Sequence, residues 1–221
     1  MSQELLQEIE ELRANFIRYT KKAFRMLPKL DRPRILDIGC GSGAPTIELA
    51  RLSDGEIIGI DIDQSSLDEL KRKIEEEGFS NRVKAVKLSL FDMDFPDGSF
   101  DIIWSEGSIT VIGFERGLKK WRRLLKPNGF LVIHDEVRNM SDTLSRIPSL
   151  GYRLAGYFSL PEDAWWTEFY RPLDGRLDGL RKKCRNDPEA LKSLKKFQNE
   201  IDMVKSNPQM FASAFCIIRK S

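Results

Sequence analysis

The 221-residue sequence contains few of the residues that build covalent or metal-bound frameworks. Its three cysteines, Cys40, Cys184 and Cys216, lie far apart. Their odd number argues against a disulfide framework, and no pair has the spacing of metal ligands. His134 is the only histidine, so we expect no metal site. Isolated thiols of this kind also favour a reducing, cytoplasmic location.

The sequence also lacks a large excess of charge and any long apolar run. Lys and Arg number 36 and Asp and Glu 34, a net charge of 36 − 34 = +2, which is no electrostatic signature of nucleic-acid binding. No apolar run approaches the roughly 18 residues of a membrane span. The N-terminal MSQELLQEIEELR has no signal-peptide core. We therefore expect neither nucleic acid nor a membrane as a partner, whereas the oligomeric state, a dimer included, stays open.

Short apolar runs alternate with helical patterns through the first two thirds of the chain. The apolar runs predict strands over residues 34–38, 56–60, 83–88, 100–104 and 130–134, and the helical patterns cover residues 43–52, 65–77 and 113–125. Residues 127–129, Pro-Asn-Gly, predict a turn. This alternation indicates an α/β fold with a parallel sheet covered by helices on both faces. Ligands bind such sheets at the carboxyl ends of the strands.

Both ends of the chain depart from this pattern. Apolar residues recur every three or four positions over residues 3–27, so we expect residues 1–30 to be helical, as a flap over the site or as a dimer helix. Beyond residue 150, Tyr152–Ser159 and Phe211–Ile218 predict two further strands. The charged helical segment between them is too long for an unstructured loop. We expect residues 160–208 to form a helical cap over one end of the sheet, within a single domain of residues 1–221.

The segment ILDIGCGSGA, which begins at Ile35, resembles the turn from a strand to a helix around a nucleotide-like cofactor. Gly39, Gly41 and Ala44 fit the dinucleotide pattern G-x-G-x-x-G/A. A pyrophosphate at this turn would lie close to Asp37, and the like charges would repel. S-adenosylmethionine (SAM) offers an ammonium group for this acid and a carboxylate for the backbone N–H donors at the helix start. Asp37 therefore favours SAM over NAD.

A second group of acids follows the next predicted strand. Asp61 ends the run EIIGID, where a carboxylate can accept both ribose hydroxyls of either cofactor. Ile62 follows and can lie flat on an adenine. Asp63 is a candidate cap for the helix that begins near Ser65.

The four segments ILDIGCGSG, IIGIDIDQSSL, FPDGSFDIIWSEG and RLLKPNGFLVIHDE follow one another over residues 34–136. In this order and at these spacings they resemble the class I SAM-dependent methyltransferases. The resemblance implies a doubly wound, mostly parallel sheet of seven strands in the order 3-2-1-4-5-7-6, with strand 7 antiparallel. The two late strands then become strands 6 and 7, with the helical cap inserted between them.

The resemblance also implies roles for individual residues. The methionine part of SAM would be held by Asp37 and by the backbone of Gly39, Cys40, Gly41, Ser42 and Gly43. Asp61 would bind the ribose, Ile62 would flank the adenine, and Ser89 with Leu90 would contact the adenine edge. Many family members carry Gly-Asp at this last position, and Asp92 is the alternative contact. Ser105 and Glu106 would face the sulfonium and the acceptor, and S-adenosylhomocysteine would be the product.

Two side chains at strand ends are candidate catalytic bases. Glu106 follows strand 4, and His134 ends strand 5. A base is needed only if the acceptor arrives protonated. The alternatives are a cofactor or structural contact for Glu106 and a buried hydrogen-bonded role for His134.

The predicted cap contains the aromatic run PEDAWWTEFYRPL. Trp165, Trp166 and Tyr170 are candidate acceptor-binding residues, and the alternative is that they pack on the sheet. Aromatic faces attract cations, so this wall, with Glu106 and Glu168, favours an amine acceptor.

The function that the sequence favours is in-line methyl transfer from SAM to a small molecule. An NAD-dependent oxidoreductase is disfavoured by Asp37 and by the Leu-Lys-Pro-Asn-Gly turn. A non-catalytic SAM-binding regulatory protein and a protein or RNA methyltransferase remain as alternatives, although the near-neutral charge weighs against RNA.

Overall fold

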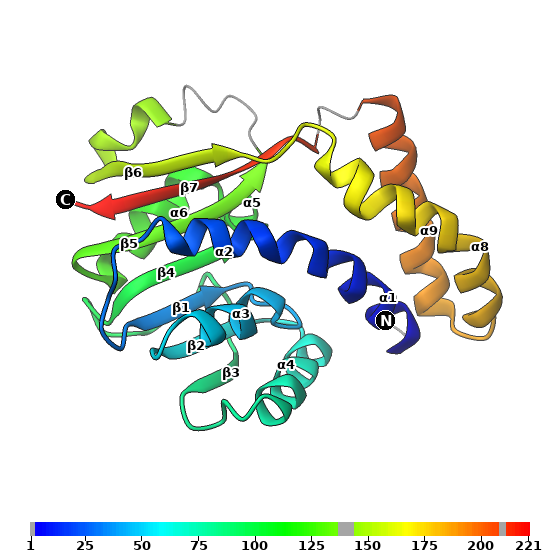
Figure 1. The fold of residues 1–221 in the computed structure, drawn as a ribbon, viewed down its shortest axis with the longest axis horizontal. Coiled ribbons are helices and arrows are strands. Elements are labelled where there is room, and N and C mark those ends of the chain that lie inside the picture. The colour runs from blue at the N-terminus through cyan, green and yellow to red at the C-terminus, as the bar shows by residue number, and fades with distance from the viewer. Residues whose placement is uncertain (1–2, 137–143, 208–210) are drawn as a thin grey trace.

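A computed structural model describes residues 3–136, 144–207 and 211–221 of the chain. Its centre is a seven-stranded sheet in the order β3-β2-β1-β4-β5-β7-β6 (Figure 1). The strands are β1 (Arg34–Ile38), β2 (Glu56–Asp61), β3 (Val83–Lys87), β4 (Phe100–Glu106), β5 (Leu125–Glu136), β6 (Tyr152–Ser159) and β7 (Ser213–Lys220). β7 runs antiparallel to both of its neighbours, and the other paired strands are parallel. The expected sheet order and the reversed last strand are confirmed.

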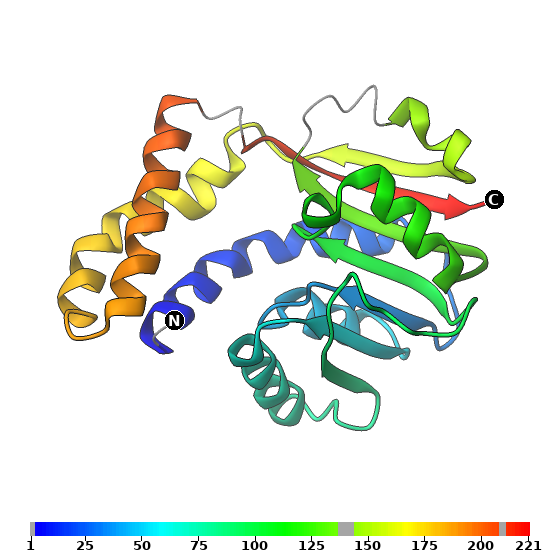
Figure 2. The same cartoon turned by 180° about the vertical axis from the view of Figure 1, so that it is seen from behind.

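Helices cover both faces of the sheet. On one face lie α2 (Ile17–Arg25), α3 (Ala44–Leu52) and α4 (Gln64–Glu76), and on the other lie α5 (Ile109–Ile112) and α6 (Phe114–Trp121) (Figures 1 and 2). The short 3-10 turns η2 (Arg122–Leu124) and η3 (Pro148–Leu150) belong to the second face. The side chains of successive β4 residues point to opposite faces of the sheet. Trp104 therefore packs into the core on the first face, and Ile103 packs into the core on the second.

The N-terminal segment forms a nearly continuous helical rod. It consists of α1 (Gln3–Arg13), the 3-10 turn η1 (Ala14–Phe16) and α2. α2 lies on the sheet, whereas α1 extends past the carboxyl ends of the strands (Figure 1). The apolar stripe expected from the sequence faces inward, since Leu5, Ile9 and Leu12 are all buried.

A helical insertion lies between β6 and β7 and stands beside α1. It contains the π-helix η4 (Trp166–Tyr170), α8 (Arg171–Lys183) and α9 (Pro188–Ser206). α1 contacts α8, and Arg176 pairs with Glu8 at 2.6 Å and Glu11 at 3.2 Å. Residues 1–2 of the expected flap and residue 208 of the expected cap lie outside the described residues.

Several expected boundaries are wrong, each for a local reason. The helix expected over 113–125 begins earlier, as α5, and breaks at Gly113, whose φ is +86°. The Pro-Asn-Gly turn lies inside β5 as a bulge between the pairs Phe100–Leu125 and Ile102–Phe130. β7 begins at Ser213 instead of Phe211. Among the described residues, no helix has the length and apolarity needed to cross a membrane.

Candidate functional site

The glycine-rich loop between β1 and α3 adopts a conformation that only glycine accommodates well. Gly39, Gly41 and Gly43 have φ values of +73°, +52° and +84°. A Cβ on Gly39 would meet Ser108 Oγ at 1.9 Å, and one on Gly43 would meet Leu70 Cδ1 at 2.2 Å. A Cβ on Gly41 would meet nothing within 4 Å. Gly41 is therefore the point where the loop backbone is open to a ligand.

The side chain of Cys40 turns away from this opening. Its thiol is buried next to Gly59, where a Cβ would meet Cys40 Sγ at 3.0 Å, and burial raises its pKa. Only the backbone of Cys40 is available to a ligand at the loop.

Asp37, at the end of β1, is a buried carboxyl without a cationic partner among the described residues. It is 2% exposed, and its Oδ2 accepts a hydrogen bond from Thr46 Oγ1 at 2.6 Å. Burial raises the pKa of Asp37 to about 7, the Thr46 hydrogen bond acts in the opposite direction, and Glu106 and Asp61 raise the pKa further. The site is thus built to receive a positive charge next to the open glycine loop.

Asp61, at the end of β2, holds the glycine loop from the other side. Its Oδ2 accepts from the N–H of Gly41 at 2.9 Å, and its Oδ1 accepts from the N–H of Asp63 at 2.9 Å. Asp63 in turn caps α4, because its side chain accepts from the Ser66 N–H at 2.8 Å. The capping role considered for Asp63 is confirmed.

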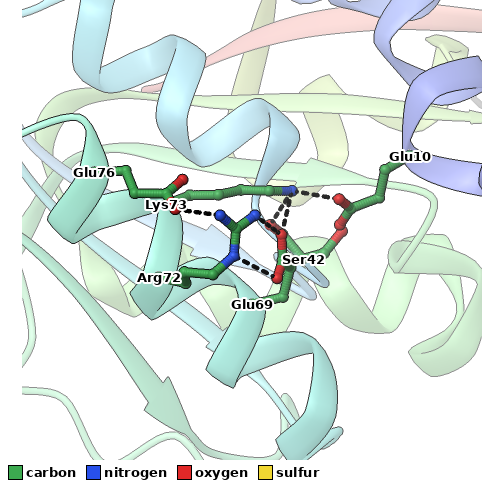
Figure 3. A network of polar contacts seen from close by, with 6 residues as sticks. All are labelled: Glu10, Ser42, Glu69, Arg72, Lys73 and Glu76. Atoms are coloured by element: carbon green, nitrogen blue, oxygen red, sulfur yellow. Dashed lines mark hydrogen bonds and ion pairs between the residues drawn. The ribbon is translucent and has the colours of Figure 1, made fainter. Parts of the chain in front are cut away.

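Lys73 of α4 connects the glycine loop to the N-terminal rod. Figure 3 shows its ammonium between Ser42, Glu10 and Glu69. Lys73 Nζ donates to the Ser42 carbonyl at 3.1 Å and pairs with Glu10 Oε2 at 2.8 Å. Both side chains of this pair are largely buried, with exposed fractions of 21% for Lys73 and 16% for Glu10. α1 is therefore tied directly to the loop that faces the ligand.

Glu106, at the end of β4, has one carboxylate oxygen clamped by two donors. Thr20 Oγ1 of α2 donates to Oε1 at 2.9 Å, and Trp104 Nε1 donates to the same oxygen at 2.7 Å. Thr20 and Trp104 are both fully buried. The second oxygen, Oε2, lies 3.7 Å from His134 Nδ1. The clamp fixes the orientation of the carboxylate and leaves Oε2 for a ligand.

The second ring nitrogen of His134, Nε2, is held by the hydroxyl of Ser213. Its Nε2 lies 3.0 Å from Ser213 Oγ, and Trp165 Nε1 donates to that same hydroxyl at 2.9 Å. Because an indole N–H can only donate, the Ser213 hydrogen is available for Nε2. This arrangement favours the ring proton on Nδ1, facing Glu106. The ring also stacks on Phe215, with centroids 4.4 Å apart.

The π-helix η4 brings the aromatic run against η1. Trp165 stacks on Phe16 with centroids 4.4 Å apart, and Asn15 Nδ2 donates to the Glu168 carbonyl at 2.9 Å. The Glu168 carboxylate accepts from Arg18 and from Tyr19, so it is engaged away from the cavity. The structure does not support the expectation that Glu168 faces an amine acceptor.

These elements enclose a cavity of about 500 Å³ at the carboxyl ends of the parallel strands. It is lined by most of the expected site residues, namely Asp37, Gly39, Cys40, Gly41, Ser42, Gly43, Asp61, Glu106, His134, Trp165 and Tyr170. The volume is typical of a small-molecule site.

Five expected site residues lie outside this lining. Ser105 is fully buried and, by strand alternation, points to the face opposite Glu106. Ile62 is 69% exposed on the surface, and Trp166 lies under Lys205 with the ammonium 5.9 Å from the ring centre. Ser89 and Leu90 follow β3, where the Ser89 hydroxyl accepts from the Phe91 N–H at 3.1 Å. Their assigned roles stay predictions.

The rod contributes cavity residues that the sequence motifs do not mark. Glu10, Arg13, Ile17 and Thr20 all line the cavity, and their spacing of three and four places them on one stripe of the rod. That stripe is adjacent to the apolar one and could have been found from the same periodicity. Ser213 was also missed, and no sequence signal marks it.

Comparison with known proteins agrees with this geometry. Residues 35–129 match the family described as "Methyltransferase domain". Sterol 24-C-methyltransferase erg6 of Aspergillus fumigatus is 31% identical over 103 residues, which cover 46% of this chain and 27% of that protein. The matches to such curated relatives span between 27% and 44% of the relatives' own length.

Solved structures share the fold over most of the chain. A SAM-dependent methyltransferase from Thiobacillus denitrificans, in complex with S-adenosylhomocysteine, has a TM-score of 0.73 at 17% identity and covers 92% of this chain and 91% of its own. The [4+2]-cyclase SpnF has a TM-score of 0.78 at 19% identity and covers 92% and 80%. Because one of these folds is named a cyclase, the likeness shows the fold alone.

The sheet order, with its reversed last strand, is that of the class I methyltransferase fold, and a glycine loop lies between acids at the ends of β1 and β2. The chain therefore has the fold of the class I SAM-dependent methyltransferases, and residues 35–129 match the methyltransferase-domain family.

Proposed function

We propose that this protein transfers a methyl group from SAM to a small-molecule acceptor bound in the cavity. The observation that carries the proposal is Asp37, a buried carboxyl with a raised pKa and no cationic partner among the described residues, beside an open glycine loop. A zwitterionic amino-acid group fits both features. SAM, when bound, supplies a methyl group that its sulfonium has already activated.

The chain's own residues hold the donor at two strand ends. Asp37 binds the ammonium group, the backbone of the glycine loop binds the carboxylate, and Asp61 binds the ribose. Asp61 already accepts from the Gly41 N–H, so the same carboxylate orders the loop and faces the ligand. The bound S-adenosylhomocysteine of the Thiobacillus denitrificans structure supports this choice of donor.

The acceptor side of the cavity contains the clamped carboxylate of Glu106. Its Oε2 accepts a proton from a protonated acceptor or stabilises a positive charge on it, and Trp165 and Tyr170 form the wall that orients the acceptor. Alignment by these groups supplies much of the rate in a displacement of this kind. His134 acts through Glu106, because both of its ring nitrogens are already directed at protein groups.

The acids of the cavity favour an amine acceptor. Asp37, Glu106 and Asp135 line the cavity beside the aromatic wall, and both kinds of group attract cations. The N-terminal rod and the inserted helices act as flap and cap, which bound the cavity and favour a small acceptor over a bulky protein.

A ligand and acceptor screen tests the proposal. We expect S-adenosylhomocysteine, but not NAD, to raise the melting temperature, and labelled methyl from SAM to be transferred to amines in preference to thiols and phenols. Stabilisation by NAD alone would overturn the choice of donor. Binding of S-adenosylhomocysteine without turnover of any acceptor would indicate a regulatory SAM-binding protein instead.

Substitution of Asp61 tests the donor site directly. Asp61→Ala removes a charged acceptor of the ribose hydroxyls, so we expect S-adenosylhomocysteine affinity to fall by roughly 10- to 100-fold, with the fold retained. Calorimetry measures the affinity and circular dichroism the fold. Asp61→Asn keeps one acceptor oxygen and should lose less affinity than Asp61→Ala. Unchanged affinity in Asp61→Ala would show that the β2 end does not bind the donor.

A further inference from the structure

Arg13, the last residue of α1, is a cation that lines the cavity and has no partner among the described residues. Among the described residues that line the cavity, it is the only arginine or lysine. Its guanidinium forms no hydrogen bond or ion pair with any described residue, whereas Arg18 on the same rod pairs with Glu168. Arg13 is accessible to solvent, because it faces the cavity.

The acids around Arg13 are already engaged by other cations and donors. Glu10 pairs with Lys73 at 2.8 Å, and Figure 3 shows its carboxylate turned toward that ammonium. Glu200 accepts from the Tyr170 hydroxyl at 3.3 Å and lies 3.9 Å from Lys196. These groups attract Arg13 through space, but none of them contacts it.

A structural role at the end of a helix does not explain this arginine. A cation in the last turn of a helix can stabilise the carbonyl end. Here α1 continues into η1 and then α2, so the end of α1 is not a free terminus.

We propose that Arg13 binds an anionic group of the methyl acceptor. This inference rests on the proposed function and names a property of the substrate. A guanidinium binds carboxylate and phosphate through paired N–H donors. Arg13 lies on the side of the cavity formed by α1 and the inserted helices, near Tyr170 and Glu200, whereas Glu106 lies at the end of β4. The acceptor therefore carries its acidic group toward the insertion and presents its nucleophile to Glu106.

Matched pairs of small probes test the proposal. The protein saturated with S-adenosylhomocysteine is titrated with phosphoethanolamine against ethanolamine, and with glycine against glycinamide. We expect the acidic member of at least one pair to bind the native protein more tightly than its neutral partner. In Arg13→Gln its dissociation constant should rise about tenfold, as for loss of one charge-assisted pair, and Arg13→Lys should retain part of the affinity.

Arg18→Gln is the matched control, because it removes an arginine from the same rod outside the cavity. It should leave the preference for acidic probes unchanged. The proposal is overturned if no acidic probe is preferred by the native protein, or if Arg13→Gln binds the preferred probe as tightly as the native protein does.

Two ligands offer an anion to Arg13, namely the acceptor and the carboxylate of the donor. The affinity for S-adenosylhomocysteine distinguishes between them. Arg13→Gln should bind S-adenosylhomocysteine within about twofold of the native protein, since the proposal assigns the arginine to the acceptor. A tenfold loss of this affinity would assign Arg13 to the donor carboxylate and overturn the proposal. A native protein that binds no S-adenosylhomocysteine would instead reject the proposed function.

Discussion

Asp37 shows at the scale of a single residue how burial prepares a carboxyl for a cation. In the ligand-free protein its pKa is about 7, against an ordinary value of 3.8. The native state therefore binds an extra proton between these pH values, and stability from this group falls as pH rises from about 4 to about 7. A bound ammonium group reverses this cost, because it favours the ionised carboxyl.

We therefore expect the affinity for S-adenosylhomocysteine to rise with pH from about 5.5 to about 7.5. The increase approaches tenfold per pH unit at the lower end, where Asp37 must lose a proton for the ammonium group to bind. Calorimetry at several pH values measures it. Asp37→Asn, which cannot titrate, should bind more weakly at neutral pH and show no such slope. An affinity independent of pH in the native protein would contradict the assignment.

Contacts between elements decide how the reactive groups are oriented. Glu106 of β4 is clamped by Thr20, which lies 86 positions earlier in α2. The N-terminal rod therefore orients a candidate catalytic group as well as lining the cavity. Thr20 is a positioning residue, since it acts through Glu106.

Thr20→Val keeps the volume but removes one donor, so we expect kcat to fall about fivefold, equivalent to one hydrogen bond of about 1 kcal/mol. The KM for SAM should not change, because Thr20 acts on Glu106 and not on the donor. Thr20→Ser restores the hydroxyl and should recover the activity. Steady-state kinetics with an amine from the acceptor screen measures these values. Equal losses of kcat in Thr20→Val and Thr20→Ser would indicate that Thr20 has a packing role only.

The contact of α1 with α4 gives a second prediction at this scale. Lys73→Met removes the ammonium that joins Glu10 to the Ser42 carbonyl (Figure 3). We expect about 1 kcal/mol less protection of the α1 amides, because a charged hydrogen bond between largely buried groups is lost. Hydrogen exchange by mass spectrometry measures it. Lys71→Met is the control, since Lys71 pairs with Asp68 in solvent. Equal exchange of α1 in both variants would contradict the link.

The periodicity of apolar residues predicted which helices and strands form better than it predicted where they begin and end. Strand β1 and strand β6 match their expected bounds, because turn residues or prolines flank them. The rod and the aromatic run were expected as regular helices, but the structure has the 3-10 turn η1 and the π-helix η4. Both irregular turns lie where Phe16 stacks on Trp165, a contact between distant segments that local patterns do not encode.

At the scale of the whole molecule, Phe215 joins the site to the core. This β7 side chain is fully buried and packs against His134, Trp104 and Phe158. We expect Phe215→Ala to lower the free energy of unfolding by about 3–5 kcal/mol, since it leaves a cavity among these rings. Urea unfolding measures the loss. Leu154→Ala, at a position 46% exposed on β6, should cost less than about 1 kcal/mol. Similar losses in the two variants would show that Phe215 is not central to packing.

The sequence by itself determined the class of fold and the set of glycines and acids at the strand ends that we propose bind the donor. Strand and helix periods, three glycines and two acids at strand ends are local features, and Asp37, Gly41 and Asp61 meet because parallel strands end at one edge. Only the tertiary structure decided the acceptor side. It brought Arg13, Thr20 and Ser213 into the cavity and turned Glu168 away from it. These placements depend on how the rod and the insertion pack together. Periodicity marks the stripe that holds Arg13 and Thr20, but it does not specify which distant segment that stripe faces.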